Sequence, residues 1–159
     1  MLIDIVTNPV LIASALAFGI SQIIKGIIDH VSHRPVRALG HGGMPSSHSA
    51  TMSALSLISG LYLGFGSAAF GIATMVAFVV MSDAAGVRNE TAKHTATIKK
   101  LTGVVNGISE QKDDMGTDEM EEFIGHTPLQ VVLGAILGLA VALGTFFIMK
   151  YGFDIGFYY

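Results

Sequence analysis

The chain has 159 residues, 51% of them hydrophobic and 13% charged, with a formal net charge of -3 and a mean hydropathy of +0.60. This composition favours an integral membrane protein with a single domain, and no basic stripe interleaved with aromatic residues indicates nucleic-acid binding. The sequence contains no cysteine, which excludes disulfides, thiolate nucleophiles and zinc-thiolate sites.

Four apolar segments predict membrane-spanning helices, at about residues 9–28, 48–65, 68–83 and 128–149. The second and third segments are short for this role and are joined by a tight turn at 64–67, which predicts a helical hairpin. We therefore expect an all-α polytopic membrane helix bundle in which residues 1–159 form a single domain. The connections 29–47 and 84–127 are expected on the same side of the membrane.

Two pairs of glycines occur in the apolar segments, each pair four residues apart. They are Gly60 with Gly64 and Gly134 with Gly138. Small residues at this spacing allow the backbones of membrane helices to approach closely. A glycine-rich helix surface of this kind also permits a homo-oligomer without requiring one.

The turn Gly42–Ser49, with the sequence GGMPSSHS, directly precedes the second apolar segment. Ser46 or Ser47 is suited to cap that helix, whose first turn offers unpaired N–H groups and a partial positive charge to an anion such as phosphate. His48 is placed where it could exchange a proton with this anion. The alternative interpretation is an ordinary capped helix after a polar turn.

A second helix start and several charged residues accompany this turn. Thr127 is a suitable N-cap for the last helix, so His126 lies just outside its N-terminus. Lys25, near the end of the first segment, is either an interface anchor or a site residue that faces the bundle interior. One interpretation of Asp83 and Arg88 is simply an ion pair. In the alternative interpretation, Asp83 orients a neighbouring basic group and Arg88 holds phosphoryl oxygens.

The long connection after the hairpin has two different parts. Residues 89–108 have apolar positions that recur at steps of three and four, which predicts an amphipathic helix lying on the membrane surface or over the site. Residues 109–122 are polar and acidic, and we interpret them as a solvated linker, with a cation site as the alternative. The histidines of residues 29–47 have no accompanying carboxylate at a ligand spacing, so no metal site is predicted.

Four membrane crossings would bring these distant groups to one face of the membrane. All Lys and Arg residues except Lys150 lie within or beside the two connections on that face. By the positive-inside tendency, this face is cytoplasmic and both termini are external. Two helix N-termini, two histidines and several cations at one face favour phosphoryl transfer.

The segments MPSSHSAT, SDAAGVR and GHTPLQV, in this order, resemble the divergent bacterial and plant branch of the type 2 phosphatidic acid phosphatase superfamily, which also contains the vanadium haloperoxidases. The resemblance covers nearly the whole chain. It implies a mechanism without metal or cofactor, in which His126 attacks phosphorus and His48 protonates the leaving oxygen. Ser46 and the backbone at Ser47 match its phosphate-binding turn, and the best available counterparts of its phosphate-binding cations are Lys25, Arg34 and Arg88.

Three positions depart from the pattern of this family. Ile27 stands where the first motif usually has a lysine, and Met120 where the third motif has an arginine, so Lys25 and Arg88 must substitute. Gln130 stands where a carboxylate normally orients the nucleophilic imidazole, and its amide oxygen would stabilise an imidazolium less.

We therefore expect an integral membrane phosphatase, in a bacterial plasma membrane, that hydrolyses a lipid or polyprenyl phosphate through a phosphohistidine intermediate. Its expected partners are the lipid bilayer and the membrane lipid phosphate, and no nucleic acid is expected. The alternative is a catalytically weak or inactive membrane protein that binds or transports lipid phosphates.

Overall fold

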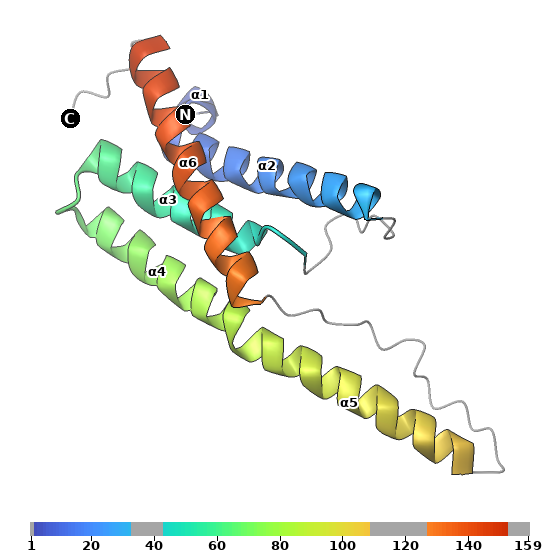
Figure 1. The fold of residues 1–159 in the computed structure, drawn as a ribbon. Coiled ribbons are helices and arrows are strands. Elements are labelled where there is room, and N and C mark those ends of the chain that lie inside the picture. The colour runs from blue at the N-terminus through green and yellow to red at the C-terminus, as the bar shows by residue number, and fades with distance from the viewer. Residues whose placement is uncertain (1, 33–42, 109–126, 153–159) are drawn as a thin grey trace.

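The computed structural model describes residues 2–32, 43–108 and 127–152, and all regular secondary structure in these ranges is helical (Figure 1). The helices in chain order are α1 (Leu2–Val6), α2 (Pro9–Val31), α3 (Ser47–Leu63), α4 (Ala68–Ala85), α5 (Val87–Ile108) and α6 (Pro128–Gly152). The prediction of an all-α polytopic bundle is confirmed. The short helix α1 was not predicted from the sequence.

Polar caps fix where the helices begin. The side-chain oxygen of Asn8 accepts hydrogen bonds from the backbone N–H groups of Val10 and Leu11 at the start of α2. Ser67 accepts from the N–H of Phe70 at the start of α4. Each cap satisfies N–H groups that have no partner within their own helix. The predicted α3–α4 hairpin is confirmed, with the turn lying between Leu63 and Ala68.

Three of the four expected membrane helices, α2, α4 and α6, are long and apolar enough to cross a membrane. The fourth, α3, has 17 residues, which corresponds to a length of about 25 Å at 1.5 Å per residue. This length is slightly below the ~30 Å of a typical hydrocarbon core. Helix α3 packs against α2, α4 and α6 and is the central helix of the bundle (Figure 1).

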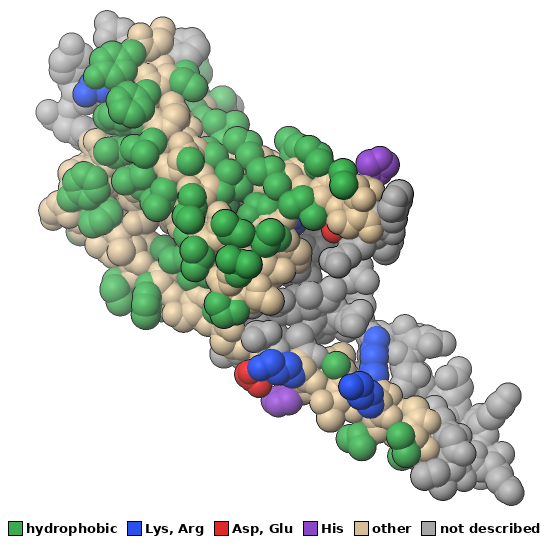
Figure 2. Space-filling model, viewed as in Figure 1, with side chains coloured by type: hydrophobic (Ala, Val, Ile, Leu, Met, Phe, Trp, Pro, Cys, Tyr) green, Lys and Arg blue, Asp and Glu red, His purple; other side chains and the backbone are tan. Residues whose placement is uncertain are grey.

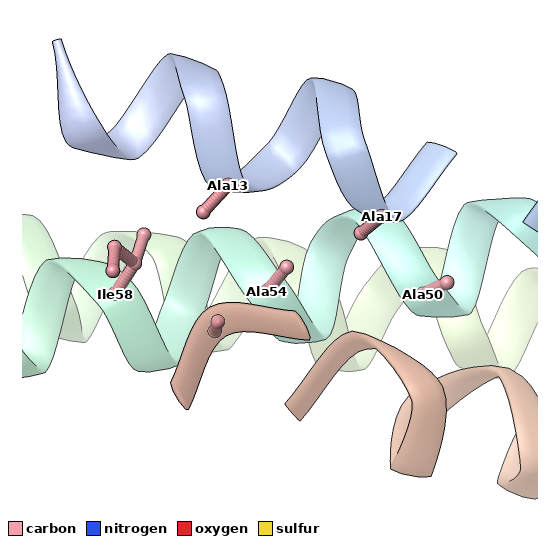
Figure 3. Close-up of a cluster of buried hydrophobic side chains, with 6 residues drawn as sticks. Ala13, Ala17, Ala50, Ala54 and Ile58 are labelled. Carbon is pink, nitrogen blue, oxygen red and sulfur yellow. The ribbon is translucent and has the colours of Figure 1, made fainter. Parts of the chain in front are cut away.

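The surface and the core of the bundle use different side chains. Figure 2 shows hydrophobic side chains spread over the bundle, as expected of helices that face lipid. The core lies where α2, α3 and α6 meet, and Figure 3 shows its side chains from α2 and α3 directed toward one another. Its fully buried members are Ala13, Ala17, Ala50, Ala54, Ile58 and Ala142. Because nearly all of them are alanine, the helices can pack at short interaxial distances.

The two glycine pairs have different roles. A Cβ atom on Gly134 would lie 2.3 Å from the carbonyl oxygen of Ser46, and one on Gly138 would lie 2.1 Å from that of Ala50. The predicted close backbone approach is therefore confirmed for this pair, which places α6 directly on α3. Gly60 instead leaves room for aromatic rings near the hairpin turn, since a Cβ there would lie 2.6 Å from Phe65.

The predicted amphipathic helix at 89–108 is confirmed as α5, which begins two residues earlier, at Val87. Its principal contacts are with α4, and it extends away from the bundle (Figure 1). Exposed apolar residues follow one side of it, while Lys93 and Lys100 are exposed on other positions. The interpretation of α5 as a cover over the site is therefore wrong.

Candidate functional site

The candidate site is built on the turn that leads into α3. Gly43 adopts a φ of 80°, a left-handed conformation that glycine reaches without strain. Ser46 is the N-cap of α3, and its Oγ accepts hydrogen bonds from the N–H of Ser49 at 3.4 Å and from the Ser49 hydroxyl at 3.1 Å. Ser46 and Ser47 are buried beside the helix N-terminus. The predicted cap is confirmed, whereas the hydroxyl of Ser49 was not among the predicted site groups.

Lys25 faces the interior of the bundle. Its side chain is only 7% exposed, and its Nζ donates a hydrogen bond to the Oγ of Ser47 at 3.2 Å. The interpretation of Lys25 as an interface anchor is therefore wrong, because packing of α2 on α3 turns this side of α2 inward. The ammonium has three N–H donors, and among the described residues only Ser47 accepts one of them.

Ile27 points away from the bundle interior, although it occupies the position at which the family that the sequence resembles usually has a lysine. It is 58% exposed. Two residues are about 200° of helical rotation, so positions 25 and 27 of α2 necessarily lie on different sides of the helix. The structure thus shows that the lysine at position 25 is the one directed at the α3 turn.

The start of α6 lies against the same turn. The backbone N–H of Ser46 donates to the carbonyl oxygen of Gln130 at 3.0 Å. Thr127 and Gln130 form a reciprocal cap: the Thr127 N–H donates to Gln130 Oε1 at 3.0 Å, and the Gln130 N–H donates to Thr127 Oγ1 at 3.4 Å. This arrangement confirms the predicted helix start at Thr127. It also shows that the amide oxygen assigned to orienting an imidazole serves the cap.

His48 and Asp83 line one pocket with a volume of about 290 Å³, and the other described residues that line it are Val79, Val80 and Ala84. His48 belongs to the first turn of α3, and Asp83 to the last turn of α4. Since α3 and α4 form an antiparallel hairpin, the start of one lies beside the end of the other. A carboxylate beside an imidazole can orient the ring and stabilise its protonated form.

The structure therefore brings several predicted site residues to one end of the bundle. They are Lys25, Ser46, Ser47, His48, Asp83 and Gln130. Arg34, His126 and the acidic segment 109–122 lie outside the described residues. Arg88 belongs to the first turn of α5, but its side chain is not among those described. Within the described ranges, no group of three or more His, Asp or Glu side chains is arranged to hold a metal ion.

Two comparisons with known proteins point to the same family. The sequence profile of a family described as "Divergent PAP2 family" matches residues 6–141. The chain is also 34% identical over 150 residues to the uncharacterized membrane protein YuiD of Bacillus subtilis, a match that covers 88% of this chain and 95% of the relative. No solved structure is significantly similar to the chain.

Proposed function

Because this chain belongs to the divergent PAP2 family of membrane proteins, we propose that it is an integral membrane phosphatase that hydrolyses a lipid or polyprenyl phosphate. The observation that carries the proposal is the buried Lys25 ammonium directed at the Ser47 hydroxyl beside the N-terminus of α3. A charged group is costly to bury in a membrane bundle, and such groups usually serve a ligand or a reaction there. An anionic phosphate would neutralise it.

The phosphate would lie at the N-terminus of α3. N–H groups in the first turn of the helix and its partial positive charge stabilise phosphoryl oxygens. The N–H donors of Lys25 that no described residue accepts would bind them as well, and the guanidinium groups of Arg34 and Arg88 are proposed to complete the site. These groups balance the charge that develops on the transferred phosphoryl group in the transition state.

The reaction would proceed in two displacements. A ring nitrogen of His126 attacks phosphorus, the bond from phosphorus to the leaving oxygen breaks, and protonated His48 donates its proton to that oxygen. Water then attacks the phosphohistidine and gives a proton to the now neutral His48. The bond between phosphorus and nitrogen breaks, and inorganic phosphate leaves with His126 and His48 restored.

The place of the site in the bundle also supports a lipid substrate. The site groups gather where the starts of α3 and α6 meet the C-terminal turns of α2 and α4, and α2, α4 and α6 are helices able to cross a membrane. A phosphate bound there would remain at the level of the headgroups while its apolar chain stays beside the bundle. We further propose that residues 1–159 form one domain, that the site faces the cytoplasm and that both termini are external.

One observation favours a second candidate function, the binding or transport of lipid phosphates without hydrolysis. The residue that would orient the His126 imidazole is Gln130, and its Oε1 already accepts a hydrogen bond from the Thr127 N–H. An amide in this role stabilises a protonated imidazole less than a carboxylate does. A chain that binds lipid phosphates tightly and releases no phosphate would have this second function.

A phosphate-release screen of the purified chain separates the two functions. The panel contains phosphatidic acid, a polyprenyl monophosphate, a polyprenyl diphosphate and a soluble phosphate ester. We expect release from at least one of the lipid phosphates, inhibition by vanadate, and little release from the soluble ester. Binding of every lipid phosphate without release from any of them would contradict the phosphatase proposal.

Replacing Lys25 by methionine is expected to lower kcat/KM for the lipid phosphate about 100-fold, as the loss of a charged donor to a transition state does elsewhere. Methionine fills a similar space in the bundle interior, so the fold should survive. The matched control is Lys150→Met, which removes an exposed lysine from the last turn of α6. Equal rates for these two variants would remove Lys25 from the phosphate site.

Replacing Asp83 by asparagine is expected to shift the alkaline limb of the pH–rate profile to lower pH, by roughly one unit. Asp83 is proposed as a positioning residue, since it shares a pocket with the proposed acid His48. Without the carboxylate, protonated His48 is less stable and gives up its proton at lower pH. A slower enzyme with an unchanged alkaline limb would show that Asp83 has only a structural role.

A further inference from the structure

Helix α5 leaves the bundle with an apolar face that none of the described helices covers. Ile98, Leu101 and Val105 are 47%, 60% and 49% exposed, respectively. We call these three residues the α5 seam. The principal contacts of α5 are with α4, which ends just before the N-terminus of α5, and the seam lies further along α5. An exposed row of large apolar side chains in a folded chain usually marks an interaction surface.

The spacing and the residue types of the seam match one heptad of a two-stranded coiled coil. Its residues follow one another at steps of three and four, as the a and d positions of a heptad do. Isoleucine and valine then occupy a positions and leucine the intervening d position, the combination that favours a parallel pair of helices. The lysines of α5 fall at the outer b and c positions of this heptad. They are Lys93, Lys99 and Lys100.

The attachment of α5 to α4 favours a parallel arrangement of two copies. Only Gly86 separates Ala85, at the end of α4, from Val87, at the start of α5. Two copies inserted in one membrane with the same orientation would therefore extend their α5 helices from the same face and at the same height. A seam of this length would pair weakly in solution, but confinement to one membrane raises its effective concentration.

We propose that the α5 seam pairs with the α5 seam of a second copy of this chain, forming a parallel dimer beyond the membrane face. The bilayer surface fits the seam less well. Figure 1 shows α5 continuing away from the bundle, and Figure 2 shows that the broad apolar covering of the bundle ends where α5 begins. The dimer does not depend on the proposed phosphatase activity.

The absence of native cysteine makes a direct test available. Leu101→Cys places one thiol in the seam, and the matched control Ala96→Cys places one at the f position, on the opposite side of α5. Each full-length variant is reconstituted into phosphatidylcholine vesicles and treated with a mild oxidant. On a non-reducing gel we expect a disulfide-linked dimer from Leu101→Cys and no such dimer from Ala96→Cys. Equal cross-linking of both variants, or of neither, would overturn the proposal.

The mass of the unmodified chain in lipid nanodiscs gives a second measurement that needs no cysteine. We expect the mass of a dimer for the unmodified chain and that of a monomer for the double variant Leu101→Asp and Val105→Asp. Ala96→Asp should remain dimeric, because its carboxylate would face water. A monomeric unmodified chain would refute the seam as a dimer contact, whatever the folding of the variants.

Discussion

Replacing His126 by alanine is expected to lower phosphate release from a lipid phosphate by about 10⁴-fold or more, to the background of the assay. The proposed reaction begins with attack of the His126 imidazole on phosphorus, and alanine offers no atom to form that bond. Removal of a nucleophile from an enzyme with a covalent intermediate commonly has an effect of this size. The measurement is phosphate release by the purified variant under conditions in which the unmodified chain is active.

The control for this experiment is His94→Ala. His94 is exposed on α5 and belongs to no part of the proposed site. We expect it to keep the activity of the unmodified chain. Trapping adds a qualitative readout: brief incubation with substrate labelled in its phosphate should leave label on the unmodified chain and on His94→Ala, but none on His126→Ala. If His126→Ala and His94→Ala released phosphate equally, His126 would have no part in the mechanism.

The helix starts at this site could be predicted because they depend on local chemistry. Ser46 or Ser47 was predicted to cap α3 and Thr127 to cap α6, from their own side chains and the apolar residues that follow; the structure has Ser46 and Thr127 as the caps. Their meeting at one end of the bundle followed from counting membrane crossings. The N–H of Ser46 bonded to the carbonyl of Gln130 joins two helix starts that are more than eighty positions apart in the chain.

The direction of Lys25 could not be predicted in this way. Helix α2 carries small and polar residues along one side, but a lysine near the end of a spanning helix faces either the bundle interior or the membrane surface, so the sequence alone does not decide whether this side faces protein. That side is chosen by packing of small residues, Ala13 and Ala17 of α2 against Ala54 of α3 (Figure 3). Lys25 follows Ala17 by eight residues, a little more than two turns, and so lies on the same buried side.

The two glycine pairs show the same limit of sequence patterns. Both pairs have the same spacing, yet only Gly134 and Gly138 bring two helix backbones together. Gly64 ends α3 with a φ of 86°, and Gly60 leaves room for a ring of the hairpin turn. Which glycine meets a backbone depends on the neighbouring helix, and the spacing of the glycines carries no information about that neighbour.

Replacing Gly138 by alanine is expected to destabilise the bundle by about 3 kcal/mol, the upper part of the range for overpacked cores. Its Cβ would lie 2.1 Å from the carbonyl oxygen of Ala50 and 2.8 Å from the carbonyl carbon. Neither atom belongs to a flexible side chain, so α6 must move away from α3. That movement would also lengthen the hydrogen bond from the Ser46 N–H to the Gln130 carbonyl oxygen, which joins the two helix starts.

The matched control has the opposite expected sign. Gly144→Ala lies on the same helix, and a Cβ there would have no atom within 4 Å. Alanine favours a helix over glycine by about 1 kcal/mol, so this variant should unfold at the same temperature or slightly higher. Thermal unfolding in one detergent should place Gly138→Ala about 10 °C below the unmodified chain. If both variants unfolded together, the close contact of α6 with α3 would be wrong. The phosphate site would then lose its framework, because Ser46 and Gln130 are held together by that contact.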